Sequence, residues 1–151
     1  MAIAVTIEKT IARSPEDVFA RIADVAAWPS WLIASGIIRV ERTADGPMTN
    51  GERLVVEQRA AGRAGTFQAT VTVHQPPSRF ALEGRDGDGV TIEIDAVLAP
   101  EGAGTNLRWS IRIGLPLRYR MLESMARPQI ERAAALDIEA LRIGLERPSS
   151  D

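Results

Sequence analysis

Residues 117–146 have the spacing of a long amphipathic helix, and this helix limits the possible folds more than any other stretch of the chain. On a helical wheel, one broad arc holds the apolar side chains Ile130, Ala133, Ala134, Ile138, Leu141 and Leu145. Charged residues such as Glu131 and Arg142 fall opposite, as expected for a helix that lies on another layer of structure. Pro128 predicts a short first segment and a kink or restart near Arg127. A single helix of this kind needs a sheet to cover.

Asp137 interrupts the apolar arc of this helix. Its neighbours on the helix surface, which cannot balance a charge, are Ile130, Ala133, Ala134, Ala140, Leu141 and Gly144. The carboxylate therefore meets a cation or donor from another element, or it faces a wet cavity. In the first case Asp137 is structural. In the second it is a polar anchor or general acid/base, with its pKa raised by burial. The sequence leaves both alternatives open.

Most of the sequence before this helix predicts β-strands. Apolar and polar residues alternate in the ranges 2–11, 37–43, 52–59, 66–75, 79–84, 90–99 and 105–113. Ser14 and Pro15 predict the start of a short helix after the first strand, and Pro29 predicts a second turn or short helix. The order predicts an α+β domain, in which a curved antiparallel sheet of six to seven strands wraps around the long C-terminal helix.

Length and composition limit the functions that this chain can have. A chain of 151 residues predicts a single domain over 1–151, with residues 147–151 as a frayed tail. The net charge of −2 indicates no nucleic-acid partner. The absence of cysteine and the single histidine exclude a cysteine-ligated or multi-histidine metal site within the chain, and no metal or other cofactor is expected. No apolar run is long enough for membrane insertion, and no signal peptide is recognisable, so a cytoplasmic location is the default expectation. A homodimer is left open.

The order of elements and several short motifs resemble the SRPBCC or START-like superfamily, whose helix-grip fold is also that of the birch pollen allergen. The matching pieces are Ser14-Pro15-Glu16-Asp17-Val18-Phe19 with Asp24, Trp28-Pro29-Ser30-Trp31, Gly51, Pro76-Pro77, Gly104-Thr105 and the long helix. The resemblance implies a cavity between sheet and helix that takes an apolar ligand. It does not choose an activity, because the family includes polyketide cyclases and dehydratases, lipid and sterol carriers, hormone receptors and cochaperone-like modules.

The predicted ligand-binding residues come from inward-facing strand positions and from the long helix: Leu54, Val56, Phe67, Ile92, Ile94, Trp109, Met125, Gln129, Ala133 and Asp137. Asp137 is also the one candidate catalytic residue. His74 groups by strand parity with the outward-facing Gln68, which argues against a catalytic role, and Arg63 is expected to be a solvated charge in a flexible loop over residues 60–65. Trp28 and Trp31 either line the pocket or hold the short helices against the sheet.

Three classes of function follow from this interpretation. A carrier or sensor of a hydrophobic small molecule, lipid-like or aromatic and polyketide-like, needs only the cavity and is favoured. A cyclase or dehydratase would need a second polar group facing Asp137, and the sequence offers no acid–base pair. A protein-interaction module would expose an apolar patch, whereas the predicted outer face is polar, with Thr91, Glu93 and Arg108.

Overall fold

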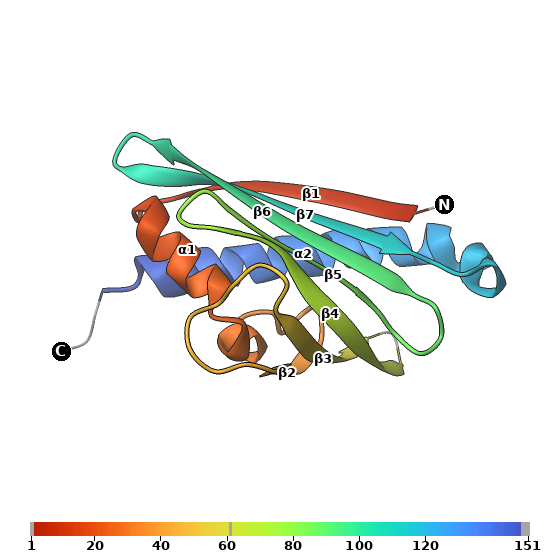
Figure 1. Ribbon diagram of the computed structural model, residues 1–151. Helices are drawn as coiled ribbons and strands as arrows, with labels where there is room; N and C mark the ends of the chain where they lie inside the picture. The colour runs from red at the N-terminus through yellow and green to blue at the C-terminus, as the bar shows by residue number, and fades with distance from the viewer. Residues whose placement is uncertain (1, 61, 149–151) are drawn as a thin grey trace.

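In a computed structural model that describes residues 2–60 and 62–148, a seven-stranded antiparallel sheet curves around one long helix (Figure 1). The strands are β1 (Ala2–Ile11), β2 (Ile37–Arg42), β3 (Arg53–Ala60), β4 (Arg63–Gln75), β5 (Arg79–Arg85), β6 (Thr91–Glu101) and β7 (Gly104–Gly114). Their order in the sheet is β1-β7-β6-β5-β4-β3-β2. The predicted α+β class, with the C-terminal helix held by a curved sheet, is confirmed.

Two short helices follow β1, as predicted. Helix α1 (Pro15–Ala23) begins where the Ser14 hydroxyl accepts a hydrogen bond from the Asp17 N–H, with Pro15 in the first turn. The 3₁₀ helix η1 (Val25–Ser30) then carries Trp28 into the interior. Both helices lie at the same end of the molecule as the C-terminal end of the long helix (Figure 1).

The central strands have the predicted register. In the antiparallel pair β6 and β7, Ile92 lies opposite Ile113 and Ala96 lies opposite Trp109. Trp109 is fully buried, which confirms that this side of both strands faces the interior.

The long helix begins at a different residue from the one expected. The 3₁₀ helix η2 (Leu117–Leu122) leads into α2 (Glu123–Glu146), and Pro128 lies inside α2. The alternative of a restart near Arg127 is therefore wrong. Pro128 falls in the second turn, where it gives up one backbone hydrogen bond without ending the helix.

Two remaining expectations concern the end of the chain and the membrane. Of the tail expected to fray, residues 149–151 lie outside the described residues. Within the ranges 2–60 and 62–148, no helix has the length and apolar character needed to cross a membrane.

Candidate ligand-binding site

The interior between the sheet and α2 is packed differently at its two ends, which we call the closed half and the open half. At the closed half, beside α1, η1 and the second half of α2, the interior is filled by fully buried side chains such as Trp28, Ile138 and Leu141. At the open half, beside η2 and the first half of α2, Ile3 is still buried opposite Ile113, but several apolar side chains are only partly buried: Ile92, Ile113, Leu115, Tyr119, Ala126 and Ile130. The apolar surface is therefore incompletely covered at one end.

Side-chain exposure rises along the central strands toward the open half. On β7 the inward-facing residues run from Leu107 at 0% exposed to Ile111 at 8%, and then to the partly buried Ile113. Their partners on β6 follow the same trend, ending at the partly buried Ile92. The strands thus lead from a solid core to an uncovered apolar surface.

The buried seam of α2 has a different phase at its start from the one predicted. It runs through Ala126, Ile130, Ala134, Ile138, Leu141 and Leu145. Met125 is 67% exposed and Gln129 is also exposed, so neither lines the interior as expected. Each precedes a seam residue by one position, which is about 100° around a helix. Ala133 is half-buried beside the seam.

The other predicted lining residues lie in the interior. Leu54, Val56, Phe67, Ile94 and Trp109 are buried, and Ile92 stands at the open half. The structure adds residues that the sequence did not single out, namely Ile113, Leu115, Tyr119, Ala126 and Ile130. Ile113 and Ile130 already belonged to apolar patterns, whereas Tyr119 in a short 3₁₀ helix had no periodic signal.

Aromatic rings fill the middle of the closed half. The ring centroids of Trp28, Trp31 and Trp109 lie 5.5–6.3 Å apart, with Phe80 6.3 Å from Trp28. The Trp28 indole N–H donates to the Ile22 carbonyl at 2.8 Å. Trp28 therefore holds the short helices against the sheet, which is one of the two roles that the sequence left open.

Asp137 is held by backbone donors from another part of the chain. Its two carboxylate oxygens accept hydrogen bonds from the N–H groups of Ala34 and Ser35, each at 2.8 Å. Burial raises the pKa of Asp137, and the hydrogen bonds from Ser35 and Ala34 oppose that rise. Asp137 therefore meets donors from another element, which is the first of the two alternatives that the sequence left open. Both of its carboxylate oxygens accept a hydrogen bond. A catalytic role for Asp137 stays a prediction.

The segment that Asp137 holds is tightly packed on β3. Gln58 donates from its side chain to the Ser35 carbonyl at 2.8 Å. Gly36 has a φ of 77°, and a Cβ there would lie 2.0 Å from the Arg59 carbonyl oxygen. Only glycine fits this close approach. Asp137 thus joins α2 to the chain between η1 and β2.

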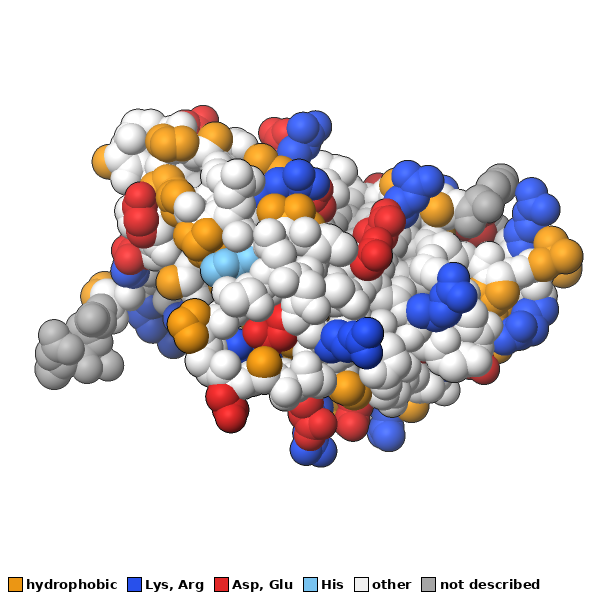
Figure 2. Space-filling view, in the orientation of Figure 1, with side chains coloured by type: hydrophobic (Ala, Val, Ile, Leu, Met, Phe, Trp, Pro, Cys, Tyr) orange, Lys and Arg blue, Asp and Glu red, His pale blue; other side chains and the backbone are white. Residues whose placement is uncertain are grey.

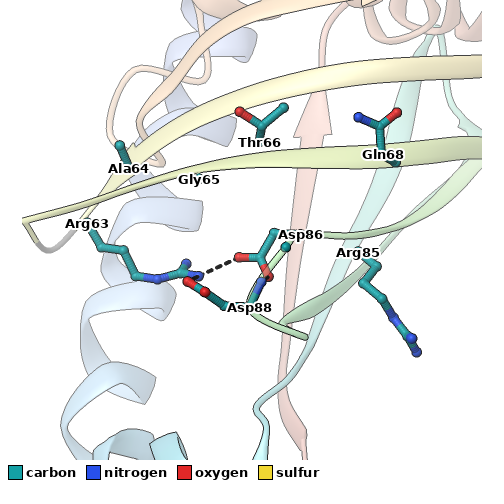
Figure 3. Close-up of a pocket in the computed structure, with 9 residues that line it drawn as sticks. Arg63, Ala64, Gly65, Thr66, Gln68, Arg85, Asp86 and Asp88 are labelled. Carbon is teal, nitrogen blue, oxygen red and sulfur yellow. Dashed lines mark hydrogen bonds and ion pairs between the residues drawn. The ribbon is translucent and has the colours of Figure 1, made fainter.

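Arg63 is an ion-pair partner and not a solvated loop charge. Strand β4 begins at Arg63, and its guanidinium binds Asp86 at 2.5 Å and Asp88 at 2.7 Å (Figure 3). Burial of Asp86 favours its neutral form, but the hydrogen bonds from Arg63, Val90 and Asp88 outweigh that effect and lower the pKa of Asp86. The sequence expectation failed because the partners are more than twenty residues away.

This arginine cluster extends to η2. Arg118 donates to the Asp88 carbonyl, and the guanidinium groups of Arg118 and Arg63 lie 4.9 Å and 5.8 Å from the ring centre of Tyr119. The cluster ties the β3–β4 turn, the β5–β6 loop and η2 together at the rim of the open half. Leu117 and Met121 of η2 are strongly exposed, and hydrophobic side chains beside basic ones are visible at that end of the molecule (Figure 2).

A hollow of about 580 Å³ lies against the same cluster. Its wall includes Thr66, Gln68 and Arg85, which belong to the face of the sheet opposite the buried Phe67 (Figure 3). The hollow is also lined by Arg63, Gly65 and the buried Asp86, so it reaches the arginine cluster itself.

His74 lies on the face opposite to the one predicted. A register shift between Val71 and Val73 reverses the alternation of β4, so His74 pairs with the inward-facing Phe80. Its ring is half-buried, with a centroid 5.4 Å from that of Phe19, and reaches the surface (Figure 2). The expectation that His74 is not catalytic stays a prediction.

Comparisons with known proteins agree with this architecture. Residues 2–142 match the model of the family described as polyketide cyclase / dehydrase and lipid transport. The chain belongs to this family, and with it to the START-like superfamily that its motifs resemble. No curated protein sequence matches significantly.

Solved structures with the same fold include proteins of different kinds. A protein of Thermus thermophilus is 19% identical with a TM-score of 0.78, covering 97% of this chain and 99% of that one. The Zhui aromatase/cyclase from a Streptomyces species is 16% identical with a TM-score of 0.76, covering 97% and 95%. A START superfamily protein from Mycobacterium smegmatis is 18% identical with a TM-score of 0.73, covering 94% and 98%. At these identities the likeness shows the fold alone.

Proposed function

We propose that the protein binds a hydrophobic small molecule in the open half, between the first half of α2 and the sheet, as a carrier or sensor. The observation that carries this proposal is the incomplete burial of apolar residues on facing inner surfaces, namely Ile92 and Ile113 on the sheet and Ile130 on α2. Covering apolar surface is favourable by roughly 25 cal/mol per Å², so an apolar ligand gains free energy there. Membership of a family described by lipid transport and polyketide cyclisation supports a ligand of this kind.

The buried acids favour a carrier or sensor over an enzyme. Glu52 is paired with Arg42 at 2.6 Å, Asp86 with Arg63, and Asp137 with two backbone N–H groups. Among the residues that the structure describes, every buried carboxylate therefore has a partner within the protein. A general acid or base needs a proton-transfer group that can reach the substrate, and no buried carboxylate is left over for that role.

Binding of Nile red, an uncharged environment-sensitive dye, tests the proposal. We expect one dye per chain, displacement by members of a panel of lipids, sterols and aromatic polyketides, and a melting temperature that rises with ligand concentration. Native mass spectrometry of the purified protein would also detect a co-purified small molecule. A folded protein that binds neither the dye nor any panel member would overturn the proposal.

Two matched variants locate the dye on α2. Ile130→Trp fills the open half and should weaken Nile red binding at least about tenfold, a loss of about 1.4 kcal/mol. Ile143→Trp is the control, because Ile143 lies on the same helix but is exposed. Equal dye affinity in both variants would place the dye elsewhere.

A further inference from the structure

We infer that the protein docks on the surface of anionic lipid bilayers through the tip of the open half. Exposed leucine and methionine side chains would enter the bilayer interface there, and neighbouring arginines would contact lipid phosphates. The apolar side chains, which we call the tip patch, are Leu117, Met121, Leu122 and Met125. The inference concerns a partner surface and goes beyond the proposed function, because the bound ligand takes no part in it.

The tip patch gathers exposed hydrophobic surface at one end of the molecule. Of the nine large hydrophobic side chains that are exposed in the described part of the chain, four lie within residues 117–125. Met121 is 91% exposed. Met121 and Leu122 lie four and three residues before Met125, so both adjoin it on the helix surface. Hydrophobic residues exposed singly are ordinary, but a contiguous group marks an interaction surface.

The inner side of this segment is already used by the fold. Tyr119 of η2 and Ala126 of α2 pack against the hydrophobic core. An amphipathic segment that covers a sheet needs only that one apolar side, and its other side is expected to be polar. The segment lies at the end of the molecule opposite α1 (Figure 1). The tip patch is therefore a second apolar side, which packing within the chain does not explain.

Basic side chains are interleaved with the tip patch. Residues 117–127 hold one glutamate and three arginines, Arg118, Arg120 and Arg127, although the whole chain has a net charge of −2. Figure 2 shows basic side chains on either side of hydrophobic ones at this end of the molecule. An arginine has an apolar stem and a charged head, so it can reach phosphates while its neighbours enter the acyl boundary. The charge pattern is thus complementary to an anionic lipid surface.

The form of the tip patch fits a bilayer better than a protein partner. A stable protein interface uses roughly 20–30 residues on each side and closely matched shapes. The tip patch has four side chains, and they project from one end of the molecule. A bilayer accepts such side chains without a matching groove. A symmetric dimer would place the patch of one copy against that of the other, and the arginines of the two copies would repel each other.

Vesicle sedimentation tests the inference with the unaltered protein. The probes are vesicles of phosphatidylcholine alone and vesicles that also contain about 30% phosphatidylglycerol, which supplies the negative surface potential. We expect the anionic vesicles to bind at least about tenfold more tightly than the neutral ones, because the arginines contribute only at a charged surface. This preference should disappear in about 1 M salt, which screens charges beyond roughly 3 Å.

Two matched variants test the apolar contact. Met121→Asp should weaken binding to the anionic vesicles roughly tenfold, because it replaces an apolar side chain at the bilayer interface by a charge. Leu136→Asp is the control, because Leu136 is also exposed and lies on α2 outside the tip patch. It makes the same change in net charge and should leave binding unchanged. Neither position is buried, so both variants should fold.

A second pair of variants tests the charge contact. Arg118 and Arg127 each have a carboxylate 3.9 Å away, whereas Arg120 is exposed and has no ion-pair partner in the described part of the chain. Arg120→Glu should therefore weaken binding to anionic vesicles roughly tenfold. Arg108→Glu is the control, because Arg108 is an exposed residue of β7, outside residues 117–127, and should bind as the parent does.

A fluorescent label locates the contact directly. The chain has no cysteine, so a single introduced cysteine can be labelled alone. A nitrobenzoxadiazole dye on Met121→Cys should brighten and shift to shorter wavelength when anionic vesicles are added, because its surroundings become apolar. The same dye on Leu136→Cys should not change.

Several outcomes would overturn the inference. They are no binding to anionic vesicles, equal binding to neutral and anionic vesicles, and equal losses in Met121→Asp and Leu136→Asp. A dimer in solution that Met121→Asp dissociates would assign the tip patch to a second copy of the chain and would also overturn it. Nile red binding is measured without vesicles, so this inference and the proposed function can fail separately.

Discussion

The two ends of helix α2 rest on the same sheet but are held in different ways. In the closed half, Leu141 is 2% exposed and α1 and η1 pack over the same end of the interior. In the open half, Ile130 continues the same helical seam but is only partly buried, and the covering elements are η2 and two turns joined by ion pairs. The comparison indicates that fold stability is concentrated at one end, which leaves the other end available for a ligand.

The energies of the two arrangements differ for a physical reason. Burying apolar side chains removes surface from water and contributes in proportion to its area. Ion pairs at a partly exposed rim contribute little, because water and salt screen them. Arg63 and Arg118 thus join the segments around the open half without making that end a second core.

The largest expected difference in stability comes from shortening one side chain of the buried α2 seam in the closed half and one in the open half. Leu141→Ala should lower the free energy of unfolding by about 3 kcal/mol, because it removes a fully buried side chain from a packed region. Ile130→Ala should cost about 1 kcal/mol, because its side chain is already partly in contact with water. Urea denaturation at unchanged slope measures both values. Equal losses would show that the two halves are equally packed.

A second, smaller effect concerns the contact between α2 and the segment before β2. Asp137→Leu should cost about 2 kcal/mol, because it leaves the N–H groups of Ala34 and Ser35 without their acceptor. Asp137→Asn should lose less, since its amide oxygen can still accept one of the two bonds. Hydrogen exchange should accelerate selectively at the amides of Ala34 and Ser35. Unchanged stability and exchange in Asp137→Leu would argue against the structural role.

The smallest effect is expected at the rim of the open half. Arg63→Met should lower stability by about 1 kcal/mol, because it leaves the buried Asp86 without its cation, while the exposed arginine limits the loss. Arg79→Met is the matched control, since the Arg79–Asp95 pair lies on the outer surface, and it should change stability by less than about 0.5 kcal/mol. Thermal or urea unfolding compares the two. A larger loss of stability in Arg79→Met than in Arg63→Met would show that the Arg63–Asp86 ion pair is the less important of the two.

Part of the site could be predicted from the sequence because it depends on local periodicity. Alternation in β6 and β7 placed Ile94 and Trp109 inward, and the helical spacing placed Leu141 on the buried seam. Met125 and Gln129 were misplaced because a row of residues spaced by four, here Met125, Gln129, Ala133 and Asp137, turns by about 40° per step around a helix. Gln129 and Met125 are therefore turned progressively away from the buried side of α2 on which Asp137 lies.

The sequence by itself determined the strands, the long helix, and the conflict that Asp137 creates on an apolar face. Only the tertiary structure decided how that conflict is resolved, because its donors are main-chain N–H groups about a hundred residues away, and any residue type except proline carries such a donor. The same holds for Arg63 with Asp86, and for His74, whose direction is reversed by a register shift in β4. Side-chain periodicity is a local property of the chain, whereas hydrogen-bond partners and strand bulges arise from contacts between distant segments.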